Sequence, residues 1–412
     1  MQMAGIEVTK EQVLEALQDP KNYQTLKDKD GNPFLVATYN LDPDPTKTGE
    51  TLEGPIPLMI AQKNEKEEWG WDDYSSILKN SGNFGHCFGS QTIPDQPVPE
   101  ILEKYFNAAT ITYTWSRREP SQSQFKMGWM DTQLKVAKQM NATNIRLAHI
   151  LTSDFYPDWV LNASKSEKEK LIRDHVRQVI TYFVDRGVTQ FNVVNEIWYS
   201  DDMARVFGRD EYVLIAFDEA NKIRDEIINK AKQRGIPPPE IKLGLSHADN
   251  HYSNGVGTPQ SLELLKILAE RGLVDYIDVH FHIKDANNLP DPNDVRKVLE
   301  TYQTFINSRT GKKIEVVVGE FDVNIAVYPQ TDGARYKKQA EIYYEYLKTI
   351  LESGINEITF WGVVDNFSWY ELGDAGNKQP DADALLFDDN GSPKLSFFAL
   401  LKAYCDVVYN GP

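Results

Sequence analysis

The sequence contains very little cysteine, which limits how the chain can be stabilised. Of 412 residues only Cys87 and Cys405 are cysteines. One bridge between them is possible, but two thiols cannot form a disulfide framework or a zinc cluster, and we expect two buried free thiols. No run approaches the ~18 consecutive apolar residues that a membrane helix needs. Residues 1–10 lack the basic segment and apolar core of a signal peptide, and the sequence leaves the cellular compartment open.

Positive charge is also scarce. The chain has 44 Lys and Arg against 61 Asp and Glu, a net charge of −17. Nucleic-acid binding depends on basic patches, so this composition argues against a nucleic-acid partner. No G-x-G-x-x-G motif opens a helix after the first predicted strand, and we expect no nucleotide or other cofactor. A neutral polymer such as a polysaccharide is compatible with an acidic surface.

From residue 84 onward, strand and helix patterns alternate. Short apolar runs predict eight strands, each followed by a helical pattern. Eight such units are the number in a closed (β/α)8 TIM barrel, an α/β fold; an open doubly wound sheet is the alternative. The predicted strands are 84–88, 109–113, 144–150, 189–194, 241–245, 276–280, 314–318 and 357–361, and the predicted helices are 99–106, 128–140, 167–186, 212–233, 261–271, 293–308, 335–352 and 396–408.

Residues 1–80 lack this alternation. We expect them to form an N-terminal extension that packs on a catalytic barrel of residues 81–412, in a monomeric protein. The spacing of apolar residues predicts a helix over 7–18 and a short helix over 71–78. Residues 41–57 are rich in Pro, Gly, Asp and Thr, which predicts an irregular loop.

Two of the predicted strands run into a glutamate. The fourth strand is followed by Asn195 and Glu196, and the seventh leads to Glu320 and Asp322. A carboxylate directly beyond a buried strand is costly unless it is solvated, paired or used. In a barrel of parallel strands both glutamates emerge at the C-terminal edge, where barrel enzymes carry out their chemistry. Two carboxylates that face each other there indicate an acid/base and a nucleophile for glycoside hydrolysis.

These residues belong to segments that resemble glycoside hydrolase family 10, the retaining endo-β-1,4-xylanases. The resemblance covers roughly residues 84–404. Each segment is short, but their order and their spacing on strands 3, 4, 6, 7 and 8 make the signal strong. The most similar segments are 193–196 (VVNE), 319–322 (GEFD) and 358–369 (ITFWGVVDNFSW), and the weaker ones are 157–159 (PDW), 275–282 (DYIDVHFH) and 385–389 (LLFDD).

The resemblance implies a double displacement on β-1,4-linked xylan or a related β-glycan. In it Glu196 is the general acid/base and Glu320 is the nucleophile, with the two carboxyl groups about 5–5.5 Å apart. His282 is implied to hydrogen-bond the nucleophile, and Asn195 to hold the sugar 2-hydroxyl. The resemblance also places His280, Trp361 and Trp369 at the reacting sugar, with Asp322 and Asp365 as supporting residues, and it implies no metal.

The chain departs from the family pattern on the side that would bind the non-reducing part of the substrate. The family's histidine and tryptophan after strand 3 fall on Ala148, Thr152 and Ser153, and His149 is one position out of step. The family glutamine of strand 6 falls on His280. We therefore expect unusual subsite requirements: either the enzyme is weak on ordinary xylan, or other residues rebuild the sugar site, for example Tyr113, Trp115, Tyr156, Trp198 or Tyr370.

Two other functions fit parts of the pattern. A carbohydrate-binding barrel with little turnover would explain the lost subsite residues, although both glutamates and Asn195 are present. A metal-dependent barrel hydrolase would use imidazoles and a carboxylate as ligands. A histidine pair within a glycosidase site needs no metal, so we favour the glycosidase. The candidate metal ligands are His280 and His282 on one strand, with His247, His251 and Asp249 after strand 5.

Overall fold

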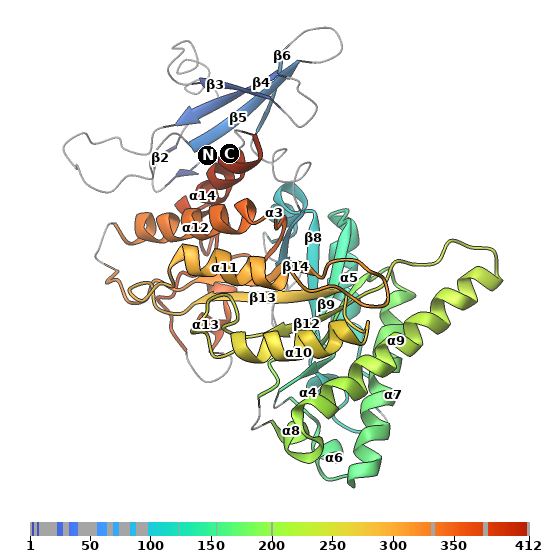
Figure 1. Cartoon of the computed structure of the whole chain (residues 1–412). Coiled ribbons are helices and arrows are strands. Elements are labelled where there is room, and N and C mark those ends of the chain that lie inside the picture. Colours follow the sequence, from blue (N-terminus) through green and yellow to red (C-terminus); the bar gives the residue numbers. More distant parts are fainter. Residues whose placement is uncertain are drawn as a thin grey trace.

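The computed structural model describes residues 101–122, 124–153, 155–198, 201–330, 334–373 and 378–407 with their side chains. It describes the backbone alone in residues 2–3, 6–7, 23–27, 33–39, 56–63, 69–73, 83–87, 98–100 and 408–409. Most of this chain forms a ring of parallel strands covered by helices (Figure 1). Within the described ranges, no helix combines the length and apolarity needed to span a bilayer.

The eight predicted strands all form, and they close into a barrel. Each pairs in parallel with the next, and the last pairs with the first. The predicted (β/α)8 TIM barrel is therefore confirmed. A two-residue strand, β10 (Leu151–Thr152), continues beside β11 beyond the end of β9. The barrel strands are β7 (Asn83–Cys87), β8 (Ala108–Thr112), β9 (Asn144–Ala148), β11 (Gln190–Asn195), β12 (Lys242–His247), β13 (Tyr276–Ile283), β14 (Glu315–Val323) and β15 (Glu357–Phe360).

Most of the predicted helices begin and end within a few residues of the predicted positions, but the helix predicted over 293–308 ends at Tyr302. Local sequence explains several limits: Ser164 and Glu167 form a capping box at the start of α7, and Gly235 and Gly354 have positive φ just after α9 and α12. The helices are α3 (Val98–Tyr105), α4 (Trp115–Arg118), α5 (Gly128–Gln139), α6 (Asp158–Leu161), α7 (Lys165–Val184), α8 (Asp202–Phe207), α9 (Arg209–Gln233), α10 (Thr258–Glu270), α11 (Pro292–Tyr302), α12 (Arg335–Glu352), α13 (Trp369–Leu372) and α14 (Leu395–Tyr404), with a 3-10 turn Asp365–Phe367 and a terminal π-turn Cys405–Tyr409.

The interior of the barrel contains a polar layer in addition to its apolar core. Arg146 on β9 forms ion pairs with Asp278 on β13 and Glu357 on β15. Asn192 also donates to Asp278, at 2.6 Å. Gly319 leaves the room for this carboxylate, because a Cβ at that position would lie 2.0 Å from both Asp278 oxygens. The layer therefore fixes β14 immediately before Glu320.

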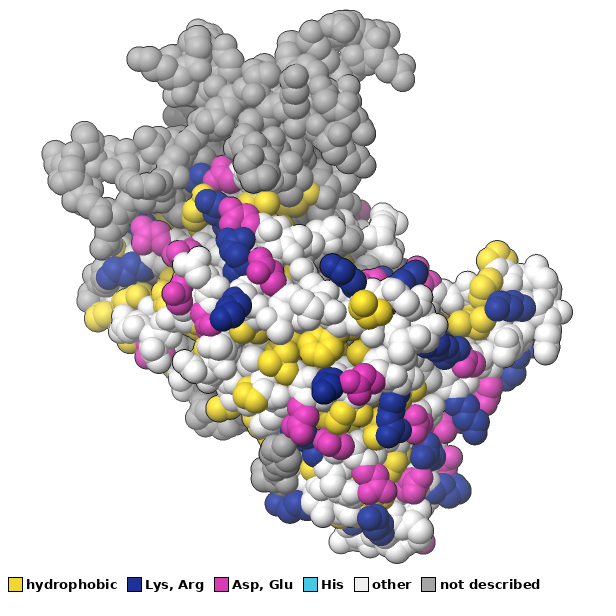
Figure 2. Space-filling model, viewed as in Figure 1, with side chains coloured by type: hydrophobic (Ala, Val, Ile, Leu, Met, Phe, Trp, Pro, Cys, Tyr) yellow, Lys and Arg dark blue, Asp and Glu magenta, His cyan; other side chains and the backbone are white. Residues whose placement is uncertain are grey.

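Figure 2 shows acidic and basic side chains interspersed over the α7 and α9 arm on one face of the molecule. Ion pairs connect many of them, such as Arg177 on α7 with Glu219 and Glu226 on α9. On this face the negative net charge is therefore not gathered into one patch. Cys405 at the end of α14 is a buried free thiol, as expected.

The N-terminal part contains a four-stranded antiparallel sheet of β3 (Tyr23–Lys27), β4 (Pro33–Tyr39), β5 (Ile56–Lys63) and β6 (Trp69–Asp73). Two short strands, β1 (Gln2–Met3) and β2 (Ile6–Glu7), precede it. The helix predicted over 71–78 is wrong at 71–73, which belong to β6, and 74–78 lie outside the described residues.

Two further N-terminal predictions lie largely outside the described part of the chain. The predicted helix over 7–18 has its first residue in β2, and 8–18 are not described; of the loop predicted over 41–57, only 56–57 are described, in β5. Strand β5 contacts α14. The division of the chain at residue 80 stays a prediction.

Candidate active site

The two predicted catalytic glutamates lie at the same end of the barrel. Glu196 directly follows the last residue of β11, and Glu320 lies in β14 beside His280 of β13 in the strand register. The backbone N–H of Glu196 donates to the carbonyl of Ser246 on β12, at 3.1 Å. Glu196 has φ +52°, a conformation that is uncommon outside glycine and clusters at functional sites.

A single imidazole joins the two glutamates. His280 Nδ1 lies 3.4 Å from Glu196 Oε1, and His280 Nε2 lies 3.3 Å from Glu320 Oε1. His280 is fully buried, whereas the Glu196 side chain is 31% exposed and that of Glu320 is 6% exposed. The acid/base candidate therefore reaches solvent, and the nucleophile candidate is held deep in the site.

Glu320 is also held by a histidine and aspartate pair. His282 Nε2 lies 2.8 Å from Glu320 Oε2, and His282 Nδ1 lies 2.9 Å from Asp322 Oδ2. Burial alone would lower the pKa of His282, but the Asp322 and Glu320 carboxylates outweigh it and raise the pKa well above its usual range. Both nitrogens of His282 face carboxylate oxygens, an arrangement that favours the doubly protonated imidazolium. Asp322 also accepts from Trp369 Nε1 at 2.8 Å and from the Tyr370 hydroxyl at 3.3 Å, so it orients both the imidazole and the indole.

The charges around the glutamates set their protonation. Burial raises the pKa of Glu320, but the charge of His280 and the contacts with His149 and His282 outweigh burial and hold the pKa far below its usual range. Burial and the Glu320 charge also raise the pKa of Glu196, yet the contact with His280 leaves it below its ordinary value. Burial lowers the pKa of His280 and the two carboxylates raise it, with a net increase. Glu196 and His280 therefore form a coupled pair, in which the protonation of one depends on the other.

The other predicted site residues divide into two groups. Asn195 and Trp361 lie at the site: Ser246 Oγ donates to Asn195 Oδ1 at 2.8 Å, which leaves the amide N–H groups able to donate to a ligand. Asp365 lies in a separate buried ion pair with Lys394 at 2.9 Å. Burial raises the pKa of Asp365 to about 6 despite that lysine. Among the described residues, no contact joins Asp365 to either glutamate, so it supports the loops and not the reacting groups.

The sequence model of glycosyl hydrolase family 10 matches residues 74–403. The chain belongs to glycosyl hydrolase family 10. This confirms the family expected from the strand-end motifs, and with it a glycoside hydrolase.

Several xylanases are distant relatives of this chain. The beta-1,4-xylanase of Dictyoglomus thermophilum is 23% identical over 316 residues, 73% of this chain and 83% of that protein. Endo-1,4-beta-xylanase 2 of Aureobasidium pullulans is 25% identical over 332 residues, 76% and 84% of the two chains. Xylanase 10B from Thermotoga maritima has the same fold, with a TM-score of 0.66 and 21% identity over 81% of this chain and 98% of that one. Xylanase 10B from Thermotoga petrophila, in complex with xylobiose, has a TM-score of 0.65, 22% identity, and coverages of 81% and 97%.

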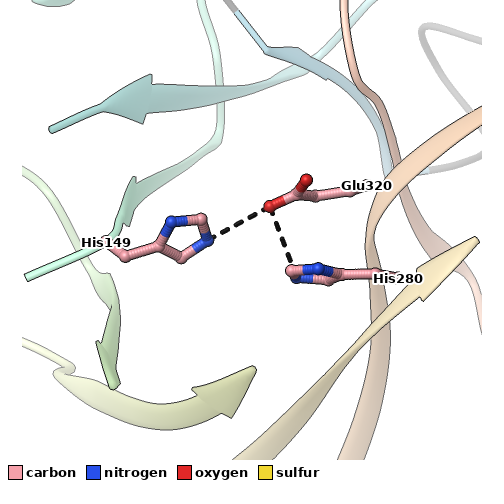
Figure 3. A group of neighbouring side chains, drawn as sticks. All are labelled: His149, His280 and Glu320. Atoms are coloured by element: carbon pink, nitrogen blue, oxygen red, sulfur yellow. Dashed lines mark ion pairs between the residues drawn. The ribbon is translucent and has the colours of Figure 1, made fainter. Parts of the chain in front are cut away.

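One residue of this family 10 site was left out by the sequence alignment. His149 Nε2 lies 3.2 Å from Glu320 Oε1, and Figure 3 shows its ring and that of His280 reaching the same carboxylate oxygen from different strands. The expectation that strand 3 supplies no histidine to the site is therefore wrong. Its ring also lies 6.1 Å from Trp361, at an interplanar angle of 28°. Its position in the sequence could have identified His149 as a site residue, because it directly follows β9, as Glu196 directly follows β11.

Three of the aromatic residues that could have rebuilt the sugar site are structural. Tyr113 and Trp115 donate to Glu119 at 3.3 and 3.2 Å, and Tyr156 donates to Asp201 at 3.1 Å. All three aromatic side chains are buried. Tyr370 holds Asp322, as described above, and Trp198, which is partly exposed and packs on His247, remains a candidate.

The metal-ligand set considered for the alternative hydrolase does not assemble. His247 contacts Gln260 at 3.1 Å, Asp249 pairs with Lys284 at 3.1 Å, and both nitrogens of His282 are occupied. His251 contacts the carbonyl of His280, at 2.7 Å. Among the described residues, the group of histidines and acids that could hold an ion is a different one: His149, His280 and Glu320.

A pocket of about 760 Å³ opens beside His282. The loops after β12 and β13 line it, and most of its side chains can hydrogen-bond or present an aromatic face. Such a lining suits hydroxyl-rich ligands, because polar groups orient a sugar and aromatic faces cover its apolar side. Lining residues include Asp249, Tyr252, Asn254, Lys284, Asn288 and Asp291.

Proposed function

We propose that this protein is a retaining endo-β-1,4-glycanase that cleaves xylan or a closely related β-glycan. The observation that carries the proposal is the convergence of Glu196 and Glu320 on the two nitrogens of buried His280. Membership of family 10 supports the reaction type, and the xylanase names of the relatives support the substrate.

In the first step, the Glu320 carboxylate attacks the anomeric carbon while the bond to the leaving oxygen breaks. Glu196 donates a proton to that oxygen, and His280 can then reprotonate Glu196. The ionised state that attack requires is favoured by the cations around Glu320. Asn195, Trp361 and Trp369 are expected to hold the sugar. The product of this step is a glycosyl ester on Glu320.

In the second step, water replaces the enzyme at the anomeric carbon. Glu320 carries no charge while it is esterified, and Glu196 now takes a proton from the water as its oxygen attacks. The bond to Glu320 breaks, the carboxylate is restored, and the sugar leaves with its original anomeric configuration. The exposed side of Glu196 is consistent with this contact with water.

The test combines rates with stereochemistry. We expect oligosaccharide release at the highest initial rate from β-1,4-xylan and at a lower rate from mixed-linkage β-glucan. We also expect an NMR spectrum in which the first product retains the β configuration. A 2-fluoro-xylobioside with a good leaving group should add its mass to the peptide that contains Glu320. Glu320→Ala should abolish release but keep oligosaccharide binding. An inverted first product, no release from any β-glycan, or an unchanged Glu320→Ala enzyme would each refute the proposal.

A further inference from the structure

We propose that His149, His280 and Glu320 form a binding site for a divalent cation, with Zn²⁺ as the best match, and that an ion bound there stops hydrolysis. The three residues come from β13, β14 and the end of β9 and lie around one carboxylate oxygen (Figure 3). The resemblance to family 10 implies glutamine at the position of His280, so the second imidazole is a feature of this chain.

The spacing of the donor atoms fits zinc. In a tetrahedral site with bonds of about 2.0–2.1 Å, neighbouring ligand atoms are about 3.3–3.4 Å apart. The two nitrogens lie 3.2 Å (His149 Nε2) and 3.3 Å (His280 Nε2) from Glu320 Oε1. Ligand atoms of all three residues lie within 4.8 Å of one another. Small side-chain movements would therefore allow all three residues to coordinate one ion.

The donor atoms are buried, and the two imidazole nitrogens contact Glu320 Oε1 without hydrogen-bond geometry. His149 Nε2, His280 Nε2 and Glu320 Oε1 have no hydrogen-bond partner, although their separations are short enough for hydrogen bonds. Buried polar atoms without partners are uncommon and costly. His282 is the contrast, since both of its nitrogens have carboxylate partners within 2.9 Å. A divalent cation between these three atoms would satisfy all of them at once, with release of any proton that the imidazoles carry.

The surroundings resemble the second layer of a metal site. The other nitrogen of His280 faces Glu196 Oε1 at 3.4 Å, which gives the carboxylate, histidine and metal sequence that orients imidazole ligands. Trp361 forms a wall beside His149. Three protein ligands leave the fourth position of a tetrahedron for water, as in zinc sites that remain open.

The inhibitory effect rests on the proposed function of Glu320, whereas ion binding does not. A carboxylate oxygen that donates its lone pair to zinc cannot attack the anomeric carbon, and an ion between the imidazoles occupies space beside the nucleophile. We therefore expect zinc to lower kcat in proportion to occupancy, with recovery after EDTA. Family members with glutamine at the His280 position should be inhibited much less at the same zinc concentration.

The test uses the full chain, treated with EDTA and dialysed, and reads binding without turnover. Calorimetry with zinc sulfate should give one ion per chain, and Co²⁺ should give the visible bands of a four-coordinate ion. His280→Gln and His149→Asn should each weaken zinc binding at least ~10-fold, as loss of a metal-site contact does. His247→Gln removes a histidine outside the cluster and should leave binding unchanged. Circular dichroism checks that each variant is folded.

Three outcomes would overturn the inference. The site does not exist if about 1 mM Zn²⁺ and Co²⁺ do not bind, or if both His280→Gln and His149→Asn bind zinc as the parent does. Full hydrolytic activity at saturating zinc would overturn the inhibition. An enzyme that binds one zinc ion at this site but cleaves no β-glycan would support the site and refute only the proposed function.

Discussion

Asp322 should control the acid side of the pH profile although it does not touch the reacting carbon. It is fully buried and accepts from His282 Nδ1 at 2.9 Å and from Trp369 Nε1 at 2.8 Å. Asp322→Asn keeps the shape and can still accept hydrogen bonds, but it removes the negative charge. A hydrogen bond to a charged group contributes about 1.5–3 kcal/mol, and about 1.4 kcal/mol is tenfold in rate. We therefore expect kcat/KM to fall about 10- to 150-fold.

The direction of the pH shift follows from two charges. Asp322 helps to raise the pKa of His282, so His282 of the variant loses its proton at lower pH. Glu320 then loses a neighbouring cation that lowers its pKa, and its pKa rises. Hydrolysis requires ionised Glu320, so the acid limb of kcat/KM should move to higher pH.

The assay is kcat/KM on an aryl β-xylobioside from about pH 3 to pH 9, with thermal unfolding as a check of folding. Trp369→Phe is the matched control, because it removes the other strong hydrogen bond to Asp322 and leaves the pair with His282 intact. Its acid limb should stay in place even if KM rises. An Asp322→Asn enzyme whose acid limb coincides with that of the parent would refute the reasoning.

Three further predictions concern neighbouring residues. His280→Gln removes a group that lowers the pKa of Glu320, so the acid limb of the kcat/KM profile should move to higher pH; a shift of that limb to lower pH would contradict this. Glu196→Ala should slow release from xylan far more than from an activated aryl glycoside, and added azide should yield a β-glycosyl azide; equal losses on both substrates would exclude Glu196 as the acid. Gly319→Ala would place a Cβ 2.0 Å from the Asp278 oxygens and should lower the free energy of unfolding by about 1–3 kcal/mol in urea titrations, whereas Gly128→Ala, with no atom near its Cβ, should change it little; equal stabilities would contradict this.

The barrel could be predicted because its strands are buried on both faces. Continuous apolar runs such as 316–318 are typical of such buried strands, and every predicted strand lies within a few residues of an observed one. Strands β13 and β14 extend further than predicted, to Ile283 and Val323. The last residues of these strands include His282 and Asp322, and a prediction based on apolar runs ends the strands before such polar residues. These polar residues remain in the sheet because they satisfy one another across adjacent strands.

Burial of individual aromatic residues could not be predicted in the same way. Tyr113 and Trp115 are residue types that often line sugar-binding sites. In this structure both are buried in the core, where they donate hydrogen bonds to Glu119. The choice depends on which carboxylate lies within reach, and that is a contact between segments. The short helix predicted over 71–78 is wrong at 71–73 for a similar reason, because these three residues pair with β5 in the N-terminal sheet.

The sequence by itself determined the eight strands, the order of the motifs and the two glutamates at strand ends, because burial and the alternation of strand with helix are local patterns. Only the tertiary structure decided that His149 and His280 meet at the same oxygen of Glu320. These residues are far apart in the chain, and only closure of the barrel brings β9, β13 and β14 to a common centre. Protonation was decided at the same level, since the pKa of each glutamate depends on charges contributed by other strands.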